Sequence, residues 1–316
     1  MLTDRPTHEG PTSETQTAAP ACIMTFNAND PSGAGGIAGD IATIAAMGAH
    51  ALSVVTTLLM RDTAEVFDQH LIDEEAVVEQ ARTILEDVSV TGWKVGFLGS
   101  AETVAAVAEI LSDYADIPLV AYAPDLSWMD EAAALPYLEA YRELILPATE
   151  VLVGNRKTLM DLLLPDWDNE RPASPRELAV AAAEHGTRFV LVTGIMLPAK
   201  GQQQFLDNVL ASGQGALAGE KFERFEVTFV GAGDTLSAAL ACLLASGAEL
   251  QSAVGEALAF LDQSLDAGFR PGMGHAVPDR FFWALPPGEG DVPPDAASPS
   301  EDPDGGPNQG EPRRVH

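Results

Sequence analysis

A short segment of this 316-residue chain, "VGAGDTLSAAL" (residues 230–240), contains the residue types that a group-transfer site needs. Gly231, Ala232 and Gly233 are small enough for a ligand to approach the backbone, and the helix expected from Asp234 would direct free N–H groups at an anion. Such a segment would stabilise charge on a transferring phosphoryl group. Asp234 could accept the proton of an attacking hydroxyl group. The residues alone support equally a second interpretation, in which Asp234 only caps the helix.

A second glycine-rich segment, "NANDPSGAGG" (27–36), follows the first apolar run of the sequence. Gly33, Gly35 and Ala38 match a loose dinucleotide-binding pattern. However, the residues Asn27–Ser32 separate that pattern from its strand, whereas a dinucleotide turn follows its strand directly. The sequence also lacks a G-x-x-x-x-G-K-[ST] phosphate loop. A Rossmann cofactor site is therefore disfavoured, and the segment is either part of a ligand site or a turn that lets the next helix pack closely.

Apolar runs that alternate with helical patterns predict the elements that would position these segments. Continuous apolar runs are typical of strands covered on both faces, and their alternation with helices predicts a parallel α/β sheet. The predicted strands are 21–26, 52–59, 93–99, 118–124, 150–155 and 188–194, with a further strand over 226–230, and the predicted helices are 37–47, 101–111, 137–146 and 174–186.

Ligands of parallel α/β sheets bind beyond the carboxyl ends of the strands. Three segments are predicted to lie there: the loop 27–36, a loop over 154–163, and the segment Gly231–Asp234. Their convergence would create one site at one edge of the sheet.

Composition limits the classes of function. The formal net charge of −30 argues against nonspecific nucleic-acid binding, and a phosphate-bearing ligand would have to be held locally by backbone dipoles, a metal or a few cations. No apolar run reaches the ~18 residues that a membrane span needs, and no apolar signal segment opens the chain. Cys22 and Cys242 lie in apolar runs and are expected to be buried, reduced thiols of a cytoplasmic protein.

Both ends of the chain differ in composition from the rest. Residues 1–20 and 287–316 are rich in Pro, Gly and Ser, and we expect them to be disordered arms. Hydrophobic residues make up 46% of the whole chain. We expect residues 21–286 to form a single globular domain.

Several segments, taken in order, resemble the ribokinase-like superfamily and, more closely, the hydroxymethylpyrimidine/phosphomethylpyrimidine kinases of thiamin biosynthesis. These segments are "DPSGAGGIAGDIATIAAMGAHALSVVTTLL", "KVGFLGS", "LILPATEVLVGN", "VLVTG", "GAGDTLSAALACLLASG" and the C-terminal "GMGHAVPDRFFWAL". The resemblance implies a three-layer fold with a central, mostly parallel sheet flanked by helices. It also implies ATP as co-substrate, Mg²⁺, a small pyrimidine substrate and a homodimer.

The resemblance also implies roles for individual residues. It places Gly231–Asp234 at the anion hole, with Asp234 against the hydroxyl group in a position where the pyrimidine kinases usually have cysteine. It implies that Asp40 hydrogen-bonds the pyrimidine, that Lys94 lies on the strand beside the pocket, and that Arg61 replaces a glutamine that contacts the pyrimidine. The implied substrate-binding residues are Ala28, Asp40, Arg61, Phe97 and Asp125, and the implied nucleotide-binding residues are Asn155, Lys157, Thr193 and Gly194.

Two acidic groups of the family pattern are missing, because Ala123 and Thr158 stand where the resemblance implies Asp and Glu. Mg²⁺ needs hard oxygen ligands, so the metal ligands stay open, with Asp125 and Asp161 as candidates. Lys157 is a candidate for neutralising phosphate charge instead.

The leading hypothesis is an ATP-dependent kinase that phosphorylates the hydroxymethyl group of 4-amino-5-hydroxymethyl-2-methylpyrimidine. Whether it also phosphorylates the monophosphate of that compound is left open. A pyridoxal-type kinase is the nearest alternative enzyme, because Arg61 and Phe97 change the pocket. A catalytically weakened paralogue that binds the ligands and acts as a regulator is the alternative outside the enzymes.

Overall fold

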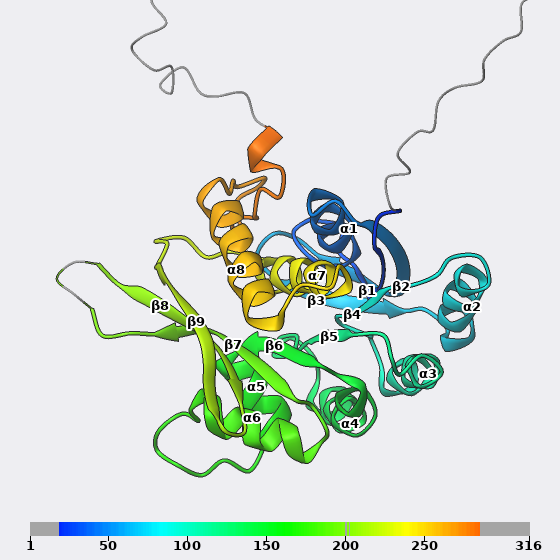
Figure 1. Cartoon of the computed structure of the whole chain (residues 1–316), viewed down its shortest axis with the longest axis horizontal. Coiled ribbons are helices and arrows are strands. Elements are labelled where there is room, and N and C mark those ends of the chain that lie inside the picture. The colour runs from blue at the N-terminus through cyan, green and yellow to red at the C-terminus, as the bar shows by residue number, and fades with distance from the viewer. Residues whose placement is uncertain (1–18, 200, 202, 285–316) are drawn as a thin grey trace, which may run out of the picture. The chain divides into compact units, whose positions relative to one another are not determined.

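The apolar runs predicted as strands form the centre of a nine-stranded sheet in the computed structural model, which describes residues 19–199, 201 and 203–284. The strands are β1 (Cys22–Asn29), β2 (His50–Arg61), β3 (Val66–Leu71), β4 (Gly92–Val95), β5 (Leu119–Tyr122), β6 (Val151–Asn155), β7 (Phe189–Met196), β8 (Phe205–Ser212) and β9 (Gly215–Glu223). Their order is β3-β2-β1-β4-β5-β6-β7-β8-β9 (Figure 1). Neighbours from β2 to β7 pair in parallel, as predicted, whereas β3, β8 and β9 pair antiparallel.

The strands at the two edges were not predicted. Most positions of β3 and β9 are exposed or half-buried, so their sequences lack the continuous apolar runs of the central strands. The expected strand over 226–230 is also wrong, because that segment makes only an isolated bridge between Phe229 and Ala276. The sequence therefore predicted the buried centre of the sheet and not its solvated edges.

Eight α-helices are described: α1 (Gly36–Ala46), α2 (Glu74–Leu85), α3 (Ala101–Ser112), α4 (Glu131–Ala140), α5 (Arg156–Leu163), α6 (Pro175–Glu184), α7 (Ala232–Ala245) and α8 (Leu250–Asp266). A π-helical turn, Tyr141–Ile145, and 3₁₀ turns at Leu146–Ala148 and Phe282–Ala284 complete the helical segments. None of the helices in the described part of the chain combines the length and the apolar character that a membrane crossing requires.

The predicted loop over 154–163 is mostly helix α5. Asn155 caps this helix, since its side chain accepts a hydrogen bond from the Thr158 backbone N–H at 3.0 Å. Leu159, Leu162 and Leu163 lie on the buried side at helical spacing. The helix begins directly after β6, so only Asn155 remains at the strand end where a loop was expected.

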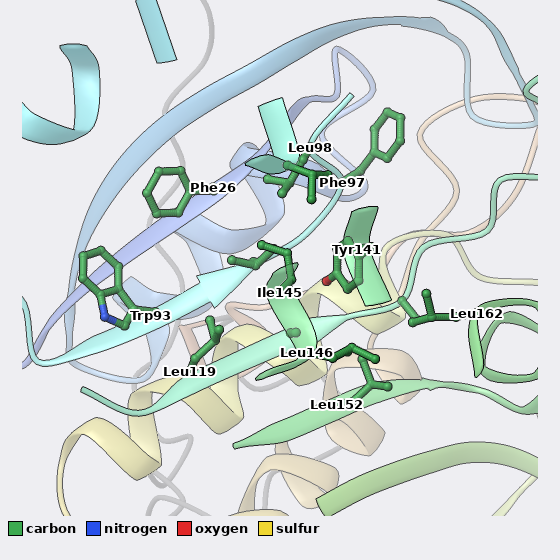
Figure 2. Close-up of a cluster of buried hydrophobic side chains, with 14 of the residues drawn as sticks. Phe26, Trp93, Phe97, Leu98, Leu119, Tyr141, Ile145, Leu146, Leu152 and Leu162 are labelled. Atoms are coloured by element: carbon green, nitrogen blue, oxygen red, sulfur yellow. The ribbon is translucent and has the colours of Figure 1, made fainter. Parts of the chain in front are cut away.

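Helices cover both faces of the sheet and divide the core into two clusters. Helices α1, α7 and α8 pack on one face, and α2 to α6 pack on the other (Figure 1). The alternation of side chains along a strand supplies both clusters, because Phe26 of β1 belongs to one and Ile23 to the other. In the larger cluster the rings of Phe26 and Trp93 have centroids 6.1 Å apart (Figure 2). This packing fixes the central strands whose carboxyl ends form the site.

The predicted arms, 1–20 and 287–316, lie outside the described residues except for Ala19 and Pro20. Both cysteines are free thiols. Cys242 is buried as expected, and burial raises the pKa of its thiol to about 12, whereas Cys22 is only half-buried. The expectation of two buried thiols is therefore wrong for Cys22.

Leu152→Ala in β6 should lower the free energy of unfolding by about 3 kcal/mol, because it leaves a cavity in the larger cluster (Figure 2). The same substitution at Leu135 of α4, which is 55% exposed, should change it by less than about 0.5 kcal/mol. Chemical denaturation measures both values. Equal losses at the two positions would contradict this assignment of the core.

Candidate active site

A cavity of about 780 Å³ opens at the carboxyl ends of the parallel strands. Each of these strands contributes to its wall, either at its end or directly after it. The contributing residues are Ala28 (β1), Arg61 (β2), Phe97 (after β4), Tyr122 (β5), Asn155 (β6) and Thr193 (β7), and the segment Gly231–Asp234 at the start of α7 completes the wall. With strands about 4.8 Å apart, the wall from β2 to β7 spans roughly 24 Å. The three segments predicted to converge at the carboxyl ends of the strands therefore all contribute residues to one cavity.

Asp234 is part of the first turn of α7, which begins at Ala232, two residues earlier than predicted. Its carboxylate makes no capping bond, because Gly231 occupies the N-cap position. Instead, its Oδ1 accepts hydrogen bonds from Lys94 Nζ at 2.7 Å and from Asn27 Nδ2 at 2.8 Å. Its Oδ2 accepts one from the Gly36 N–H at 2.9 Å. The capping interpretation of Asp234 is therefore wrong.

Lys94 lies between two carboxylates and is completely buried. Its ammonium is 2.7 Å from Asp234 and 2.8 and 2.9 Å from the two oxygens of Asp40. Asp40 Oδ2 also accepts hydrogen bonds from the Thr25 hydroxyl at 2.5 Å and from Asn27 Nδ2 at 3.0 Å. One cation thus pairs with two carboxylates, and uncharged donors of β1 add further hydrogen bonds to both.

Asp40 does not contact the cavity. The residue is 0% exposed and is not among the residues that line the wall. The expected hydrogen bond between Asp40 and a pyrimidine therefore does not fit the structure. Asp40 lies on the buried side of α1 and forms an ion pair with Lys94.

The surroundings of the two carboxylates shift their pKa values in opposite directions. Burial alone would raise the pKa of Asp234, but the charge of Lys94 and the bonds from Lys94, Gly36 and Asn27 outweigh it and lower this pKa. Burial raises the pKa of Asp40 despite the opposing charge of Lys94, and the negative charge of Asp234 adds to the rise. The surroundings therefore favour the ionised form of Asp234 more strongly than that of Asp40.

The glycines beside Asp234 make room for protein groups. Gly231 has a φ of +88°, which favours glycine, and a Cβ there would overlap the carbonyl oxygen of Ala34. A Cβ on Gly233 would overlap the ring of Tyr122. These contacts give a reason for glycine at both positions that the sequence did not show, and the prediction that the small residues admit a ligand stays a prediction. The two glycines let the start of α7 dock against the loop before α1 and against the end of β5.

Asp30 organises the glycine-rich loop before α1. Its Oδ1 accepts hydrogen bonds from the Ser32 N–H and hydroxyl at 2.8 and 2.6 Å, and its Oδ2 accepts one from the Gly35 N–H at 3.0 Å. Asp30 Oδ2 also lies 3.4 Å from Nη1 of Arg61, whose side chain is 11% exposed. The loop thus connects the cation at the end of β2 to the backbone beside Asp234.

Most of the remaining predicted residues line the cavity, but three do not. Ala28, Phe97, Asp125, Asn155 and Thr193 lie in its wall together with Arg61. Gly194, Lys157 and Asp161 are not part of this wall. The predicted nucleotide residues are therefore only partly brought together.

The two candidate metal ligands are joined by a lysine. Nζ of Lys157 lies 2.9 Å from Asp161 and 3.4 Å from Asp125, and all three side chains are more than half exposed. No group of three or more His, Cys, Asp or Glu side chains that could hold a metal occurs among the described residues. Asp161 is therefore a surface partner of Lys157, and Asp125 is the candidate that also lines the cavity.

Sequence reasoning missed the contacts of three residues at this site. Lys94 was expected beside the pocket, but its pairing with Asp40 and Asp234 was not foreseen. A polar side chain inside an apolar run, as in "WKVGF" and "MTFNAN", was a usable signal for Lys94 and Asn27. For Tyr122, which packs against Gly233, the sequence carries no such signal, because tyrosine is ordinary in a strand.

Comparisons with known proteins agree with this arrangement. The model of the phosphomethylpyrimidine kinase family matches residues 30–279. The hydroxymethylpyrimidine/phosphomethylpyrimidine kinase of Streptomyces coelicolor is 30% identical over 275 residues, which are 87% of this chain and 99% of that protein. The chloroplastic thiamine biosynthetic bifunctional enzyme TH1 of Arabidopsis thaliana is 30% identical over 251 residues, 77% of this chain but only 46% of that enzyme.

A solved structure shares the fold. The pyridoxal kinase of Bacillus subtilis, crystallised as an ADP complex, superposes with a TM-score of 0.73 over 85% of this chain and 100% of that chain. Its sequence identity is 22%, so this likeness concerns the fold. The predicted ribokinase-like α/β fold is confirmed.

Lys94→Met should lower the free energy of unfolding by about 3–5 kcal/mol at pH 7, because it leaves Asp40 and Asp234 buried without their cation. Lys157→Met, which removes a cation that is 61% exposed, should cost less than about 1 kcal/mol. Denaturant titration of both variants measures the difference.

The decrease in the free energy of unfolding caused by Lys94→Met should become smaller as the pH is lowered from 8 to 5. Without the cation, burial raises the folded-state pKa of each carboxylate above its unfolded value, so the folded variant binds more protons and gains stability on acidification. In the wild type, the lowered pKa of Asp234 gives stability that is lost only as the pH falls through that low value. If the difference in free energy of unfolding between Lys94→Met and the wild type did not change with pH, the carboxylates would not be the groups left unpaired.

Gly233→Ala should lower the free energy of unfolding by about 1–3 kcal/mol because the new methyl group meets the Tyr122 ring. In a Tyr122→Leu background, Gly233→Ala should lower the free energy of unfolding by clearly less. Thermal or chemical unfolding of the four proteins of this cycle measures the coupling. Identical costs in both backgrounds would exclude Tyr122 as the reason for glycine.

Proposed function

The chain belongs to the phosphomethylpyrimidine kinase family, and we propose that it transfers the γ-phosphoryl group of ATP to the hydroxymethyl group of 4-amino-5-hydroxymethyl-2-methylpyrimidine. The family and the curated relative from Streptomyces coelicolor are kinases, so the chain is a phosphotransferase. The name of the plant relative connects this reaction to thiamin biosynthesis.

One observation carries the proposal: the Asp234 carboxylate lies in the wall of the cavity, and its Oδ2 accepts a hydrogen bond only from the Gly36 N–H among the described groups. In our proposal the substrate hydroxyl lies against this oxygen and gives it its proton while attacking phosphorus. The first backbone bond of α7 runs from the Thr235 N–H to the Gly231 carbonyl. The N–H groups before it are free to face the transferring phosphoryl group.

The two ends of the cavity suit different parts of the reaction. Phe97 and Trp128, whose ring centroids are 5.7 Å apart, line the wall and offer an apolar surface to a flat heteroaromatic ring. Ala28 and Arg61 border this acceptor end. Asn155 and Thr193, on β6 and β7, border the other end, where we place the nucleotide. Asp40, Gly194 and Lys157 have no direct ligand contact in this proposal.

We also propose that Mg²⁺ acts with the nucleotide. Asp125 and Asn155 line the cavity and supply oxygen atoms, the ligand type that Mg²⁺ prefers. When bound, the ion would offset phosphate charge. Because one protein carboxylate is a weak site, most of its ligands would be phosphate oxygens and water.

A homodimer, expected from the resemblance, and a cytoplasmic location, expected from the two cysteines, complete the proposal. The free thiols of Cys22 and Cys242 fit a reducing compartment. Exposed apolar side chains on β2 and β3, such as Met60 and Phe67, offer a surface for a second copy. Sedimentation of a monomer at micromolar concentration would contradict the dimer.

Asp234→Asn should lower kcat for phosphorylation of the pyrimidine alcohol by about 10²–10⁴-fold with a small change in KM, because the proton acceptor is lost while the shape of the wall is kept. ADP release and the phosphorylated product are measured with Mg-ATP. Asp113→Asn, an exposed carboxylate at the end of α3, is the matched control and should leave both constants unchanged.

The same assay with pyridoxal as acceptor tests the alternative enzyme. Higher kcat/KM for pyridoxal than for the pyrimidine would replace the proposed substrate. Binding of both ligands without any product would favour the regulator that sequence analysis left open. Undiminished turnover in Asp234→Asn would remove Asp234 as the base.

A further inference from the structure

We propose that the hydroxyl group of Tyr122 donates a hydrogen bond to the phosphoryl group while this group is transferred from the nucleotide to the acceptor. Tyr122 would then be a second catalytic residue beside Asp234 with a different task, because it stabilises negative charge on the phosphoryl oxygens and keeps its own proton. The inference rests on the proposed function, since it assigns a further residue of that same site.

Tyr122 is the last residue of β5, the strand that lies between the two ends of the cavity. In the sheet, β5 is placed between β4 and β6. The proposed acceptor end borders Phe97, which follows β4, and the proposed nucleotide end borders Asn155, the last residue of β6. A group that moves from the nucleotide to the acceptor therefore passes the end of β5, where Tyr122 lines the cavity.

The Tyr122 hydroxyl lies against the start of α7. A Cβ on Gly233 would overlap the hydroxyl oxygen of Tyr122 as well as its ring. Gly233 is part of the first helical turn, whose free N–H groups are the backbone donors proposed to face the phosphoryl group. The hydroxyl would add one side-chain donor to these backbone donors.

The backbone of Tyr122 is fixed, whereas its hydroxyl has no partner among the described groups. The carbonyl oxygen of Tyr122 accepts a hydrogen bond from the Tyr141 hydroxyl at 3.1 Å, and Tyr122 pairs with Val153 of β6. The Tyr122 hydroxyl oxygen is not one of the fully enclosed polar atoms that lack a partner, so solvent or a ligand can reach it. A half-buried tyrosine normally directs its hydroxyl to a hydrogen-bond partner, and this one faces the cavity.

The surroundings of Tyr122 keep its hydroxyl protonated. Burial raises the pKa of Tyr122 above its ordinary value, and the negative charges of Asp234 and Asp125 raise it further. Tyr122 is therefore a hydrogen-bond donor at neutral pH and not a base. The influence of both carboxylates agrees with a hydroxyl that lies between the proposed proton acceptor, Asp234, and the proposed metal ligand, Asp125.

The transfer leaves Tyr122 chemically unchanged. The acceptor oxygen bonds to the γ-phosphorus of ATP, the bond from that phosphorus to the β–γ bridging oxygen breaks, and its electron pair leaves with ADP. The hydroxyl proton of the acceptor passes to Asp234 and then to solvent. During this exchange negative charge is spread over the three equatorial oxygens of the phosphoryl group. A donor fixed beside their path stabilises the transition state more than it stabilises bound ATP.

Tyr122→Phe tests the inference because it removes the hydroxyl and keeps the ring against Gly233. With Mg-ATP and 4-amino-5-hydroxymethyl-2-methylpyrimidine, kcat should fall about 10–100-fold, and KM for either substrate should change less than about 3-fold. The midpoint of chemical unfolding should equal that of the wild type. Tyr114→Phe is the matched control, because Tyr114 packs edge-on against Trp93 and is not in the wall of the cavity, and its kcat should stay unchanged.

Binding gives a second readout that does not need turnover. ADP with Mg²⁺ and aluminium fluoride imitates the phosphoryl group during transfer, whereas AMP-PCP imitates bound ATP. In calorimetry with the pyrimidine alcohol present, Tyr122→Phe should bind the fluoride complex about 10-fold or more weakly. Its affinity for AMP-PCP should fall less than about 3-fold.

Unchanged kcat in Tyr122→Phe beside an active wild type would overturn this inference and leave the proposed kinase intact. A lower unfolding midpoint with unchanged kcat would assign Tyr122 to packing alone and would overturn it too. So would equal affinity of the wild type and Tyr122→Phe for the fluoride complex. A wild type that phosphorylates neither the pyrimidine nor pyridoxal would instead contradict the proposed function, on which this inference rests.

Discussion

The buried ammonium of Lys94, shared by Asp40 and Asp234, is the interaction on which the site depends. It joins β4, α1 and α7, and Thr25 and Asn27 of β1 donate further hydrogen bonds to the two carboxylates. A buried charge without its partner costs several kcal/mol, so these elements are stable only when docked in this arrangement. The same contacts that hold the fold together therefore determine where Asp234 points and which charge it carries.

This network explains how an acidic chain could handle phosphate. The formal net charge is −30, and the wall of the cavity has more acidic than basic side chains, so attraction between whole molecules does not bring ATP to the site. Free N–H groups at the start of α7 and a metal carried by the nucleotide are local means of holding phosphate. Lys94 and the other donors favour the ionised form of Asp234, and this is the form that could accept the proton of the acceptor hydroxyl group in the proposed reaction.

The sequence was sufficient to predict the central strands and the edge of the sheet at which the cavity opens, with Asp234 in its wall. It failed where a role depends on partners from distant segments. Parallel pairing sets Thr25 opposite Lys94, which brings Asp40 and Asp234 to one cation, and no local pattern shows this register. Gly233 was attributed to ligand access because Tyr122 could not be placed against it. Asp125 and Asp161 were considered as metal ligands because they lie near Ala123 and Thr158 in the sequence. That both carboxylates pair with Lys157 is visible only in the structure.

The most direct test of this account is the ionisation of Asp234 itself. A ¹³C NMR titration of aspartate carboxylates, with the Asp234 signal assigned by its loss in Asp234→Asn, would follow the group without substrate. We predict that this signal does not titrate between pH 5 and 8, since Lys94 and the other donors lower the pKa of Asp234 below its usual value. A titration within that range would show that Lys94 and the other donors do not hold the carboxylate ionised, and it would contradict the network on which this account of the site rests.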